Sequence, residues 1–416
     1  MQSIEGFDFV PLTFGRDGKL QQAGEFNRFD RLVSAADATD AIVIAHGFRN
    51  DERDATRLYT EFLNTFRAHL ARHEFQPALA ERRFVVAGVY WPSKAFRETF
   101  DTDEDGTRSL GDGDGMAKVT ARLAELKDSV SRPADANPTI DRALALLPSL
   151  QDSPGAQDEF VSLVLSLVSD AHADATEGVE QIRAQAGSEL LARFDSSRDV
   201  FGSIAGRINQ FLNLTTWYLM KDRAGSVGAG GVADVVRRVK SKHQGLKIHL
   251  VGHSLGARVV AACTNALGAT PMVQPDSLTL LEGAFSHFGF SADNGKGAEG
   301  FFRKVLANKI VKGPLIATFS AEDTVVGRAY AIVSRLAGDA TREIGDADDP
   351  FGGIGRNGAL RTAEAVAGKL ASPGTPYDFK TGVVTSLDGS GGLIKNHGDV
   401  TNAHVTYAFA SAVART

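Results

Sequence analysis

The chain has 416 residues, 43% of them hydrophobic, with 45 Lys and Arg residues against 51 Asp and Glu residues. This length suits one large domain with an insertion or two to three smaller domains, and the apolar content excludes a disordered protein. The net charge of −6 argues against a general binder of nucleic acid or anionic membranes, because basic patches drive both kinds of binding. The single cysteine, Cys263, excludes an internal disulfide and a zinc site built from cysteines.

No segment has the pattern of a targeting signal or of a membrane span. The first six residues lack the basic stretch and apolar run of a secretory signal. The most apolar segment, residues 161–168, is much shorter than the roughly 20 apolar residues that a membrane helix needs. We therefore expect a soluble, cytoplasmic protein.

The first hundred residues alternate between strand and helix patterns. Residues 7–10 and 12–14 predict an early strand pair, broken by Pro11. Residues 41–45 and 84–90 are short continuous apolar runs, which are typical of parallel strands covered on both faces. Between these two runs, apolar residues recur every four positions and predict an amphipathic helix, at Leu58, Phe62, Phe66 and Leu70.

Residues 101–224 interrupt this alternation. An acidic, glycine-rich stretch at residues 101–115 leads into a series of helical patterns without a convincing strand. The segment is longer than a crossover between parallel strands requires, so it predicts a helical insertion that could act as a lid over a pocket. We therefore divide the chain into a strand–helix domain, residues 1–100 and 225–416, and this insertion.

The alternation resumes after the insertion. Strands are expected at residues 247–251, 278–281, 315–319 and 381–384. Helices are expected at residues 232–239, 257–267, 329–336 and 404–413. Together with the first hundred residues, this pattern predicts the α/β class, with a mostly parallel central sheet flanked by helices.

The segment Gly252-His253-Ser254-Leu255-Gly256 fits the pattern G-x-S-x-G and lies between a predicted buried strand and a predicted helix. A sharp turn at that point would strain the backbone of Ser254 and present its hydroxyl at the edge of the sheet, with the positive end of the helix dipole behind it. The flanking glycines allow neighbouring backbone to pass closely. Ser254 is therefore the candidate nucleophile.

A serine nucleophile needs a base that is oriented by a carboxylate. In sheets that carry a serine on such a turn, the acid and then the histidine follow along the chain. Asp323 lies a few residues beyond the strand at 315–319 and is the candidate acid, with Glu322 as the close competitor. Three further aspartates lie in a glycine-rich loop and are interpreted as solvated surface charges, namely Asp346, Asp348 and Asp349.

Three histidines follow the predicted turn at Ser254. His397 lies in a loop between the last strand and the last helix, from which an imidazole can reach back to the serine. His404 starts the last helix and fits a surface or capping role, and His287 comes before the acid in chain order. His397 is therefore the candidate base.

An acyl transfer also needs two N–H groups that bind the oxyanion of the transition state. The backbone amide of Leu255, next to the serine, is one candidate, and the amide of Phe48, in the loop after the strand at 41–45, is the other. In the same loop, Gly47 would let the backbone pass close to a substrate. His46 is interpreted as a structural histidine behind the site.

Two further residues are candidate substrate contacts. Trp91 could line an acyl pocket or belong to the core. Arg223, in the segment 220–225, could contact an anionic substrate, although an anchoring role between the insertion and the sheet is favoured.

Two weaker motifs are interpreted as loops. An acidic stretch partly matches a calcium-binding loop, but its twelfth position is Asp where a bidentate Glu is usual; it comprises Asp101, Asp103, Asp105, Gly106 and Asp112. Residues 353–358 match G-x-G-x-x-G, but no predicted strand precedes them, which disfavours dinucleotide binding.

Several segments together resemble an uncharacterised bacterial branch of the α/β-hydrolase superfamily, which is esterase- and lipase-like. They are residues 45–48, 90–93, 220–225, 252–257, 320–323, 345–349 and 397–400. The resemblance covers most of the chain outside the middle of the insertion. It implies the α/β-hydrolase fold, a triad of Ser254, Asp323 and His397, and hydrolysis of an ester-like bond. One departure is that this insertion enters before the strand of the nucleophile, whereas lids of the superfamily usually enter after the strand that follows the nucleophile helix.

The sequence therefore predicts a serine hydrolase that acts on a carboxylic ester, most simply an esterase- or lipase-like enzyme. The substrate would be a small molecule or lipid-like ester, and the chemistry requires neither a cofactor nor a metal. A thioesterase or a peptidase with the same triad is one alternative. The other is a hydrolase-like scaffold that only binds a ligand or a partner.

Overall fold

The computed structural model describes residues 3–94, 112–130, 133–169, 174–194, 203–337, 347 and 349–416. Within this part, a nine-stranded sheet has the strand order β1-β2-β4-β3-β5-β6-β7-β9-β8. Strand β1 pairs with β2 antiparallel, and the other pairs are parallel. The strands are β1 (Ser3–Ile4), β2 (Phe7–Thr13), β3 (Asp40–Ala45), β4 (Phe84–Tyr90), β5 (Lys247–His253), β6 (Ser277–Leu281), β7 (Leu315–Phe319), β8 (Ala365–Lys369) and β9 (Val384–Asp388). The predicted α/β class with a mostly parallel sheet is confirmed.

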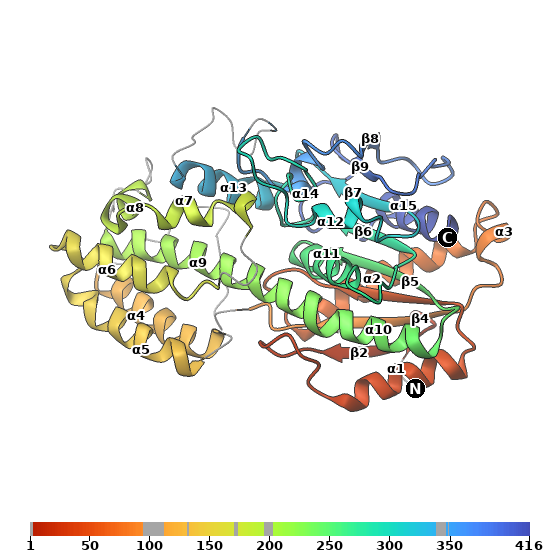
Figure 1. The fold of residues 1–416 in the computed structure, drawn as a ribbon, viewed down its shortest axis with the longest axis horizontal. Coiled ribbons are helices and arrows are strands. Elements are labelled where there is room, and N and C mark those ends of the chain that lie inside the picture. Colours follow the sequence, from red (N-terminus) through yellow and green to blue (C-terminus); the bar gives the residue numbers. More distant parts are fainter. Residues whose placement is uncertain are drawn as a thin grey trace.

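Helices cover both faces of this sheet (Figure 1). The central strands β3 and β4 are buried at every residue, as their continuous apolar sequences predict. Ile42 and Ile44 pack on one face, and Ala41 and Val43 pack on the other. On the Ile42 face lie α2 (Glu52–Leu70), α3 (Gln76–Leu79) and α15 (Ala403–Ala414). On the opposite face lie α1 (Ala23–Ala35), α10 (Ala233–Lys242), α11 (Leu255–Leu267), α12 (Arg303–Ala307) and α13 (Thr324–Leu336).

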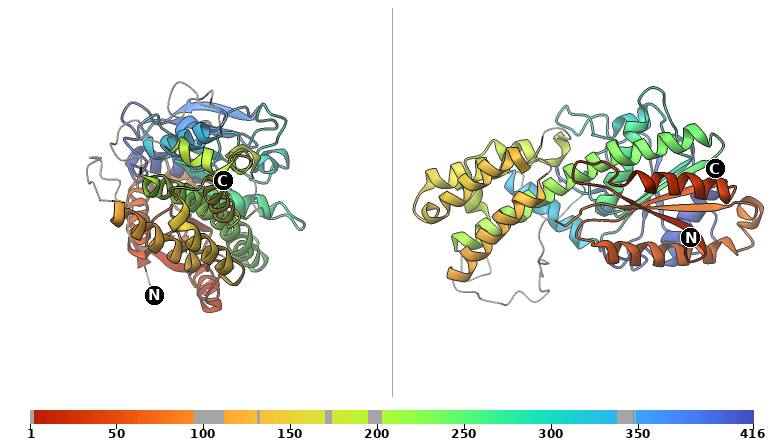
Figure 2. Two further views of the ribbon diagram at one scale, coloured as in Figure 1. Left: turned by 90° about the vertical axis from the view of Figure 1, so that its left-hand side faces the viewer. Right: turned by 90° about the horizontal axis from the view of Figure 1, so that it is seen from below.

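A helical layer is inserted between β4 and β5 and extends away from the sheet on the side of the strands' carboxyl ends (Figures 1 and 2). It comprises α4 (Asp112–Ser129), α5 (Pro133–Leu146), η1 (Leu147–Ser149), α6 (Pro154–Leu165), η2 (Ala175–Glu177), α7 (Val179–Arg183), α8 (Gly187–Arg193) and the long helix α9 (Ile204–Ser226). In its described residues, this layer contains no strand. Its apolar core is continuous with the core on one face of the sheet.

Helix α9 runs back to the sheet and continues through a π-helical turn, η3 (Val227–Val232), into α10. Two glycines of this turn are required by close packing: a Cβ on Gly228 would lie 2.1 Å from the carbonyl oxygen of Val259 in α11, and a Cβ on Gly231 would lie 2.3 Å from that of Gly18. A π-helical turn is wider than an α-helical turn, and its glycines, which have no side chains, let helix α11 pack directly against its backbone.

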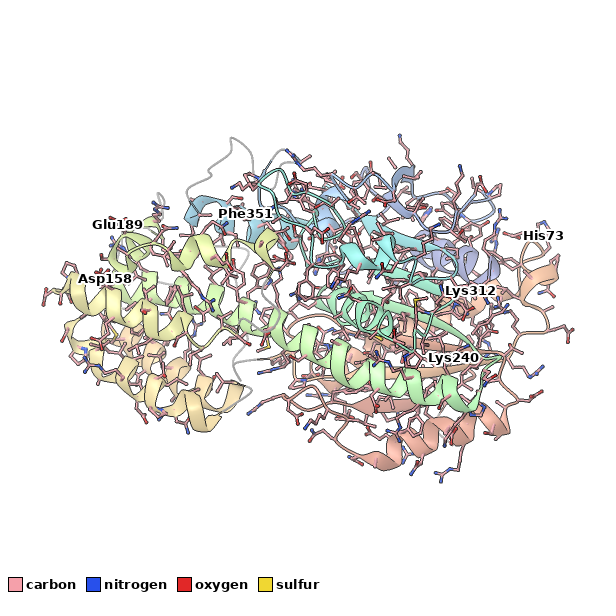
Figure 3. The ribbon with its side chains drawn as sticks, viewed as in Figure 1. His73, Asp158, Glu189, Lys240, Lys312 and Phe351 are labelled. Carbon is pink, nitrogen blue, oxygen red and sulfur yellow. The ribbon has the colours of Figure 1, made fainter. Side chains whose placement is uncertain are left out.

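The helical layer packs on segments that follow the carboxyl ends of the strands. Arg223 of α9 donates to the carbonyl of Pro92, just after β4, and Ser286, after β6, donates its backbone N–H to Glu177. Gly178 lies against Phe351, which Figure 3 labels where the layer meets the rest of the molecule. Asp158 and Glu189 lie out on the layer, whereas Lys240 and Lys312 lie toward the opposite end of the sheet (Figure 3). The insertion thus lies on the side at which the parallel strands end.

Some predicted element boundaries were wrong. Strand β2 is a single strand that passes through Pro11, because β1 pairs with β2 only at Phe7 and Asp8 and leaves no partner on that side of the proline. The last strand, β9, begins at Val384 rather than near residue 381, and the exposed edge strand β8 had no apolar pattern to predict it. The short helix α14 (Ile354–Asn357) occupies the G-x-G-x-x-G segment.

No helix of the described residues has the length and apolar character that crossing a membrane requires.

Candidate active site

Ser254 alone forms the turn between strand β5 and helix α11. Its backbone has φ 58° and ψ −123°, a region that residues with a side chain rarely adopt. The turn is possible because the residues two positions before and two positions after Ser254 are glycines. A Cβ on Gly252 would lie 2.2 Å from the carbonyl oxygen of Gly256, and a Cβ on Gly256 would lie 2.2 Å from that of Ala45. Packing against these neighbours therefore holds Ser254 in its strained conformation.

The structure brings Ser254, His397 and Asp323 into one row. The Nε2 atom of His397 lies 2.8 Å from Oγ of Ser254, and its Nδ1 atom lies 2.8 Å from Oδ2 of Asp323. A carboxylate only accepts hydrogen bonds, so Nδ1 carries the ring proton and Nε2 is left to accept from the serine hydroxyl. The three residues follow strands β5, β7 and β9, whose carboxyl ends lie at the same edge of the sheet.

Asp323 is held by the start of helix α13. It caps helix α13, and its Oδ1 atom accepts from the backbone N–H of Val326 at 2.9 Å. Its side chain is completely buried. The side chain of the competing acid, Glu322, has other partners: it accepts from the hydroxyl of Ser320 and from the backbone N–H of Gly391. Asp323, and not Glu322, therefore contacts the imidazole.

The loop that carries His397 is held by its own polar side chains. The Asn396 side chain accepts from the N–H of Gly398, and the Asp399 side chain accepts from the N–H of Lys395. In addition, the neighbour of the serine, His253, donates from Nε2 to the carbonyl of His397 at 2.8 Å. Burial lowers the pKa of His253 to about 3, so its ring is neutral at ordinary pH. Sequence reasoning missed this contact, because only the fold joins the two loops.

The loop that holds Gly47 and Phe48 lies beside Ser254. A Cβ on Gly47 would lie 2.7 Å from Cβ and 3.3 Å from Oγ of Ser254, so the loop after β3 contacts the serine directly. Phe48 follows in that loop, and Leu255 is the first residue of α11. Within the described residues, neither amide donates a hydrogen bond to another protein group. Both therefore remain available to an acceptor.

His46 and Trp91 pack behind this loop. The indole of Trp91 is stacked on the ring of His46, with centroids 5.6 Å apart, and donates to the carbonyl of His46 at 3.0 Å. Burial lowers the pKa of His46 to about 4, which fits the structural role expected for it. Trp91 is only 4% exposed and belongs to the core, so it supports the loop from behind.

Arg223 is buried and donates to the carbonyl of Pro92. Burial lowers the pKa of Arg223 to about 10. This contact joins the insertion to the end of β4 and agrees with the anchoring role that the sequence favoured.

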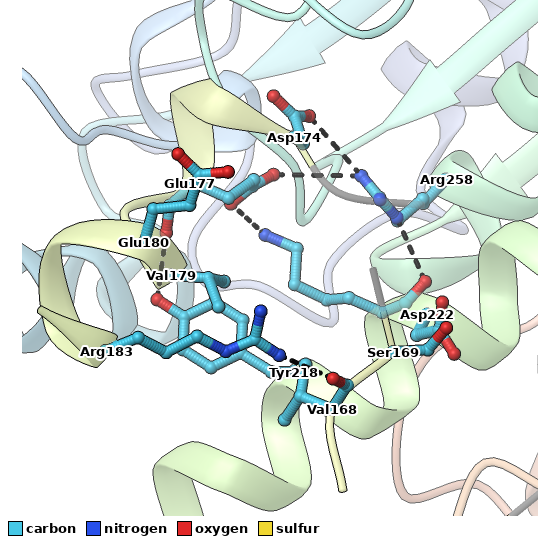
Figure 4. Close-up of a pocket in the computed structure, with 11 residues that line it drawn as sticks. Val168, Ser169, Asp174, Glu177, Val179, Glu180, Arg183, Tyr218, Asp222 and Arg258 are labelled. Carbon is cyan, nitrogen blue, oxygen red and sulfur yellow. Dashed lines mark hydrogen bonds and ion pairs between the residues drawn. The ribbon is translucent and has the colours of Figure 1, made fainter. Parts of the chain in front are cut away.

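A buried ionic cluster, which we call the clasp, joins the insertion to the sheet domain (Figure 4). Lys221 of α9 contacts Glu177 and donates to the hydroxyl of Tyr330 on α13 at 2.8 Å. Arg258 of α11 lies 3.8 Å from Glu177 and 3.7 Å from Asp174. Burial lowers the pKa of Lys221 to about 8, even though the neighbouring Glu177 acts to raise it. The clasp lines a small pocket that includes none of Ser254, Asp323 and His397, so this pocket is not the candidate active site.

The remaining candidates lie elsewhere. His404 contacts the carbonyl of Ala371, and His287 is buried beside Asn357. Asp349 was expected at the surface but is buried, where it accepts from Ser334 and from the N–H of Phe351. That expectation was wrong because a loop rich in glycine and aspartate gives no signal of burial. Asp346 and Asp348 lie outside the described residues, as do Asp101 to Gly106 of the acidic stretch and the side chain of Asp112.

A second Ser–His–Asp row lies at the other end of the strands, near the amino ends of β3, β5 and β6. His249 is 2.8 Å from Oγ of Ser277 and 2.8 Å from Oδ1 of Asp40. All three side chains are completely buried at the starts of strands, and Asp40 also pairs with Arg82. None of these three residues has the left-handed backbone of Ser254, and none is exposed to solvent. The geometry of three side chains alone therefore does not distinguish a reactive serine from a structural one.

Comparisons of the chain with models of protein families, with curated proteins and with solved structures find no match. The chemistry of the site thus has to be inferred from its own geometry. A serine hydroxyl, an imidazole and a buried carboxylate in one row can transfer a proton away from the serine, and backbone amides beside such a serine can stabilise negative charge on an attacked carbonyl.

Proposed function

We propose that the protein is a serine hydrolase that cleaves a carboxylic ester through an acyl-enzyme. The main support is the row Ser254–His397–Asp323, with both hydrogen-bond distances at 2.8 Å, next to two amides that no other protein group uses in the described residues. The buried row at Ser277 lacks the strained turn and the amides, and this difference favours Ser254 as the reactive residue.

In the proposed reaction, His397 accepts the hydroxyl proton of Ser254 while the serine oxygen attacks the ester carbonyl. The amides of Phe48 and Leu255 bind the oxyanion of the tetrahedral intermediate. His397 then gives the proton to the leaving alcohol, and an acyl group remains on Ser254. Water activated by His397 attacks this acyl group, releases the acid and restores the serine. Asp323 holds the imidazole in the tautomer that these steps require and stabilises its charged form.

We also propose that the sheet is of the α/β-hydrolase type. Three features support this assignment: a strained serine between a strand and a helix, an oxyanion loop after strand β3, and the chain order serine, acid, histidine. The insertion between β4 and β5 then lies over the edge of the sheet that carries the site.

The substrate is proposed to carry an apolar acyl group. Phe48 is half-buried beside the serine loop, and Val325, two residues beyond Asp323, is 57% exposed although it is apolar. A site flanked by such side chains gains free energy by covering them with hydrocarbon. A series of p-nitrophenyl esters with increasing acyl length measures this preference, and matched thioester and amide substrates separate esterase from thioesterase or peptidase activity.

The direct test is labelling with a fluorophosphonate, which reacts covalently with activated serines. We expect the wild-type protein to be labelled and to hydrolyse short p-nitrophenyl esters, and Ser254→Ala to do neither with an unchanged circular dichroism spectrum. Ser277→Ala is the matched control, because Ser277 also contacts a histidine that contacts an aspartate but lies in the buried row. Persistent labelling of Ser254→Ala, or absence of turnover across a broad ester library, would exclude the proposal.

A further inference from the structure

Glu282 directly follows strand β6 and is completely buried. Its backbone φ is 44°, in the left-handed region that favours glycine. A long acidic side chain is therefore kept at a position that is both strained and closed to water. Backbone strain and the burial of a carboxyl group both lower the free energy of unfolding. A contact of the Glu282 side chain is therefore expected to account for its presence at this position.

The backbone around Glu282 holds the serine turn. The N–H of Ser254 donates to the carbonyl of Leu281 at 3.0 Å, and the carbonyl of Ser254 accepts from the N–H of Ala284 at 3.1 Å. The N–H of Glu282 itself faces Oγ1 of Thr318 in the neighbouring strand β7 at 3.3 Å. Glu282 thus lies between the serine on one side and the strand that leads to Asp323 on the other.

The carboxyl group of Glu282 has few polar neighbours. In the described residues, no N–H or O–H donor is oriented for a hydrogen bond to either of its oxygens. The groups with which it interacts are the Thr318 side chain, the Asp323 carboxyl and, through its charge, Asp399 in the His397 loop. A carboxylate that is fully buried without a hydrogen-bond donor is strongly destabilised, so the Glu282 carboxyl group is more stable when it holds a proton.

The contacts of the Asp323 and Glu282 carboxyl groups differ. Asp323 accepts from the N–H of Val326 and from Nδ1 of His397, and it caps a helix of 13 residues, whose dipole favours negative charge. Glu282 has no comparable support. Burial and the nearby Asp323 charge raise the pKa of Glu282 well above its usual value.

We propose that Glu282 is a positioning residue of this site: its carboxyl group stays protonated and donates a hydrogen bond to the Asp323 carboxylate, which keeps Asp323 aligned with His397. This inference rests on the proposed function for its effect on rate, but the protonation of Glu282 is a property of the folded protein alone. A neutral acid orients Asp323 without adding a second negative charge beside the imidazole.

The test compares Glu282→Gln, which keeps a neutral donor, with Glu282→Met, which has similar length but no donor. We expect Glu282→Gln to retain kcat/KM for a short p-nitrophenyl ester within about threefold, and Glu282→Met to lose about tenfold or more in kcat with little change in KM. Glu322→Gln is the control, because Glu322 contacts Ser320 and Gly391 rather than Asp323. Equal losses in the Gln and Met variants, or full activity in the Met variant, would overturn the proposal.

Infrared difference spectroscopy of wild type against Glu282→Gln tests the proton directly at pH 7. The carbonyl stretch of a protonated carboxylic acid is expected in the wild type and absent from the variant. This measurement needs neither activity nor a folded Met variant, so absence of the band refutes the inference even if Ser254 is reactive. Conversely, a clear band in a protein that no fluorophosphonate labels would refute the hydrolase proposal and leave the protonated Glu282 in place.

Discussion

The ring of His253 donates a hydrogen bond to the backbone carbonyl of His397, with 2.8 Å between Nε2 and the oxygen. The two rings also lie against each other, with centroids 4.8 Å apart. His253 is the neighbour of the candidate nucleophile, and His397 is the candidate base. The residue before the serine therefore sets the position of the loop from which the base reaches the serine.

Removal of this hydrogen bond should lower kcat and leave KM nearly unchanged. We expect His253→Leu to lose about tenfold or more in kcat, because the His397 loop loses the donor that fixes it and small displacements at a reacting group are costly. His253→Gln, which retains an N–H donor, should recover part of the rate. His404→Gln is the control, since His404 contacts the carbonyl of Ala371 instead. A His253→Leu enzyme with wild-type kcat would rule out this positioning role.

The strain at Ser254 predicts an unusual stability effect. Ser254 has φ 58° and ψ −123°, which costs a residue with a side chain about 1–3 kcal/mol. Glycine adopts this conformation freely but loses roughly 0.5–1 kcal/mol through the greater freedom of its unfolded chain. Ser254→Gly should therefore raise the free energy of unfolding by about 0.5–2 kcal/mol while it abolishes activity. Urea unfolding checks this, with Ser254→Ala as the variant that keeps the strain; a glycine variant less stable than the alanine variant contradicts the prediction.

Gly47 makes a purely steric prediction, because its backbone does not lie in the left-handed region. A Cβ at this position would lie 2.7 Å from Cβ of Ser254, closer than real side chains approach. Gly47→Ala should displace the loop or the serine and lower kcat/KM on the order of 100-fold in a folded protein. The matched control is Gly24→Ala in helix α1, where an added Cβ meets open space. Near-normal turnover by Gly47→Ala would show that this loop does not border the reacting groups.

The three residues of the candidate row could be predicted because each lies in the segment that follows the carboxyl end of a parallel strand. Such ends meet at one edge of the sheet, so chain order and strand pattern were sufficient to bring Ser254, Asp323 and His397 together. The contacts of His253 and Glu282 could not be predicted in this way. They join loops that are far apart in the chain, and a single acidic residue after a strand is ordinarily interpreted as a surface charge.

The same reasoning explains what was missed in the fold. Strands β3 and β4 are buried on both faces and therefore have continuous apolar sequences. Strand β8 lies at the edge of the sheet, with Val366 44% exposed, so burial imposes no pattern on it. The passage of β2 through Pro11 depends on where β1 stops pairing, which is a property of the assembled sheet.

Acid should destabilise the fold through its buried histidines. Burial lowers the pKa of His46 to about 4 and those of His253 and His287 to about 3, whereas an unfolded histidine has a pKa near 6.5. Below about pH 6.5 the unfolded chain therefore binds more protons, and each such histidine lowers the free energy of unfolding by about 1.4 kcal/mol per pH unit until its folded pKa is reached.

Replacement of one of these histidines should reduce that pH dependence. We expect the free energy of unfolding of His287→Gln, measured in urea between pH 5.5 and 4.5, to fall about 1.4 kcal/mol per pH unit less steeply than that of the wild type. His73→Gln is the control, since the His73 side chain is 97% exposed. An unchanged slope in His287→Gln would mean that this ring is already protonated in the folded protein.

The clasp between the insertion and the sheet domain predicts that removal of one of its buried charges alone destabilises the fold. Lys221 and Glu177 are both 3% exposed, so Lys221→Met leaves a buried carboxylate without its closest cation. The expected loss in the free energy of unfolding is about 3–5 kcal/mol, and the double variant Glu177→Gln with Lys221→Met should recover part of it because no buried charge is left unpaired. Arg142→Met breaks an exposed ion pair with Glu159 on the insertion and should cause no measurable change. Equal effects of Lys221→Met and Arg142→Met in urea unfolding would show that the clasp does not hold the insertion, and would favour an insertion that moves freely over the site.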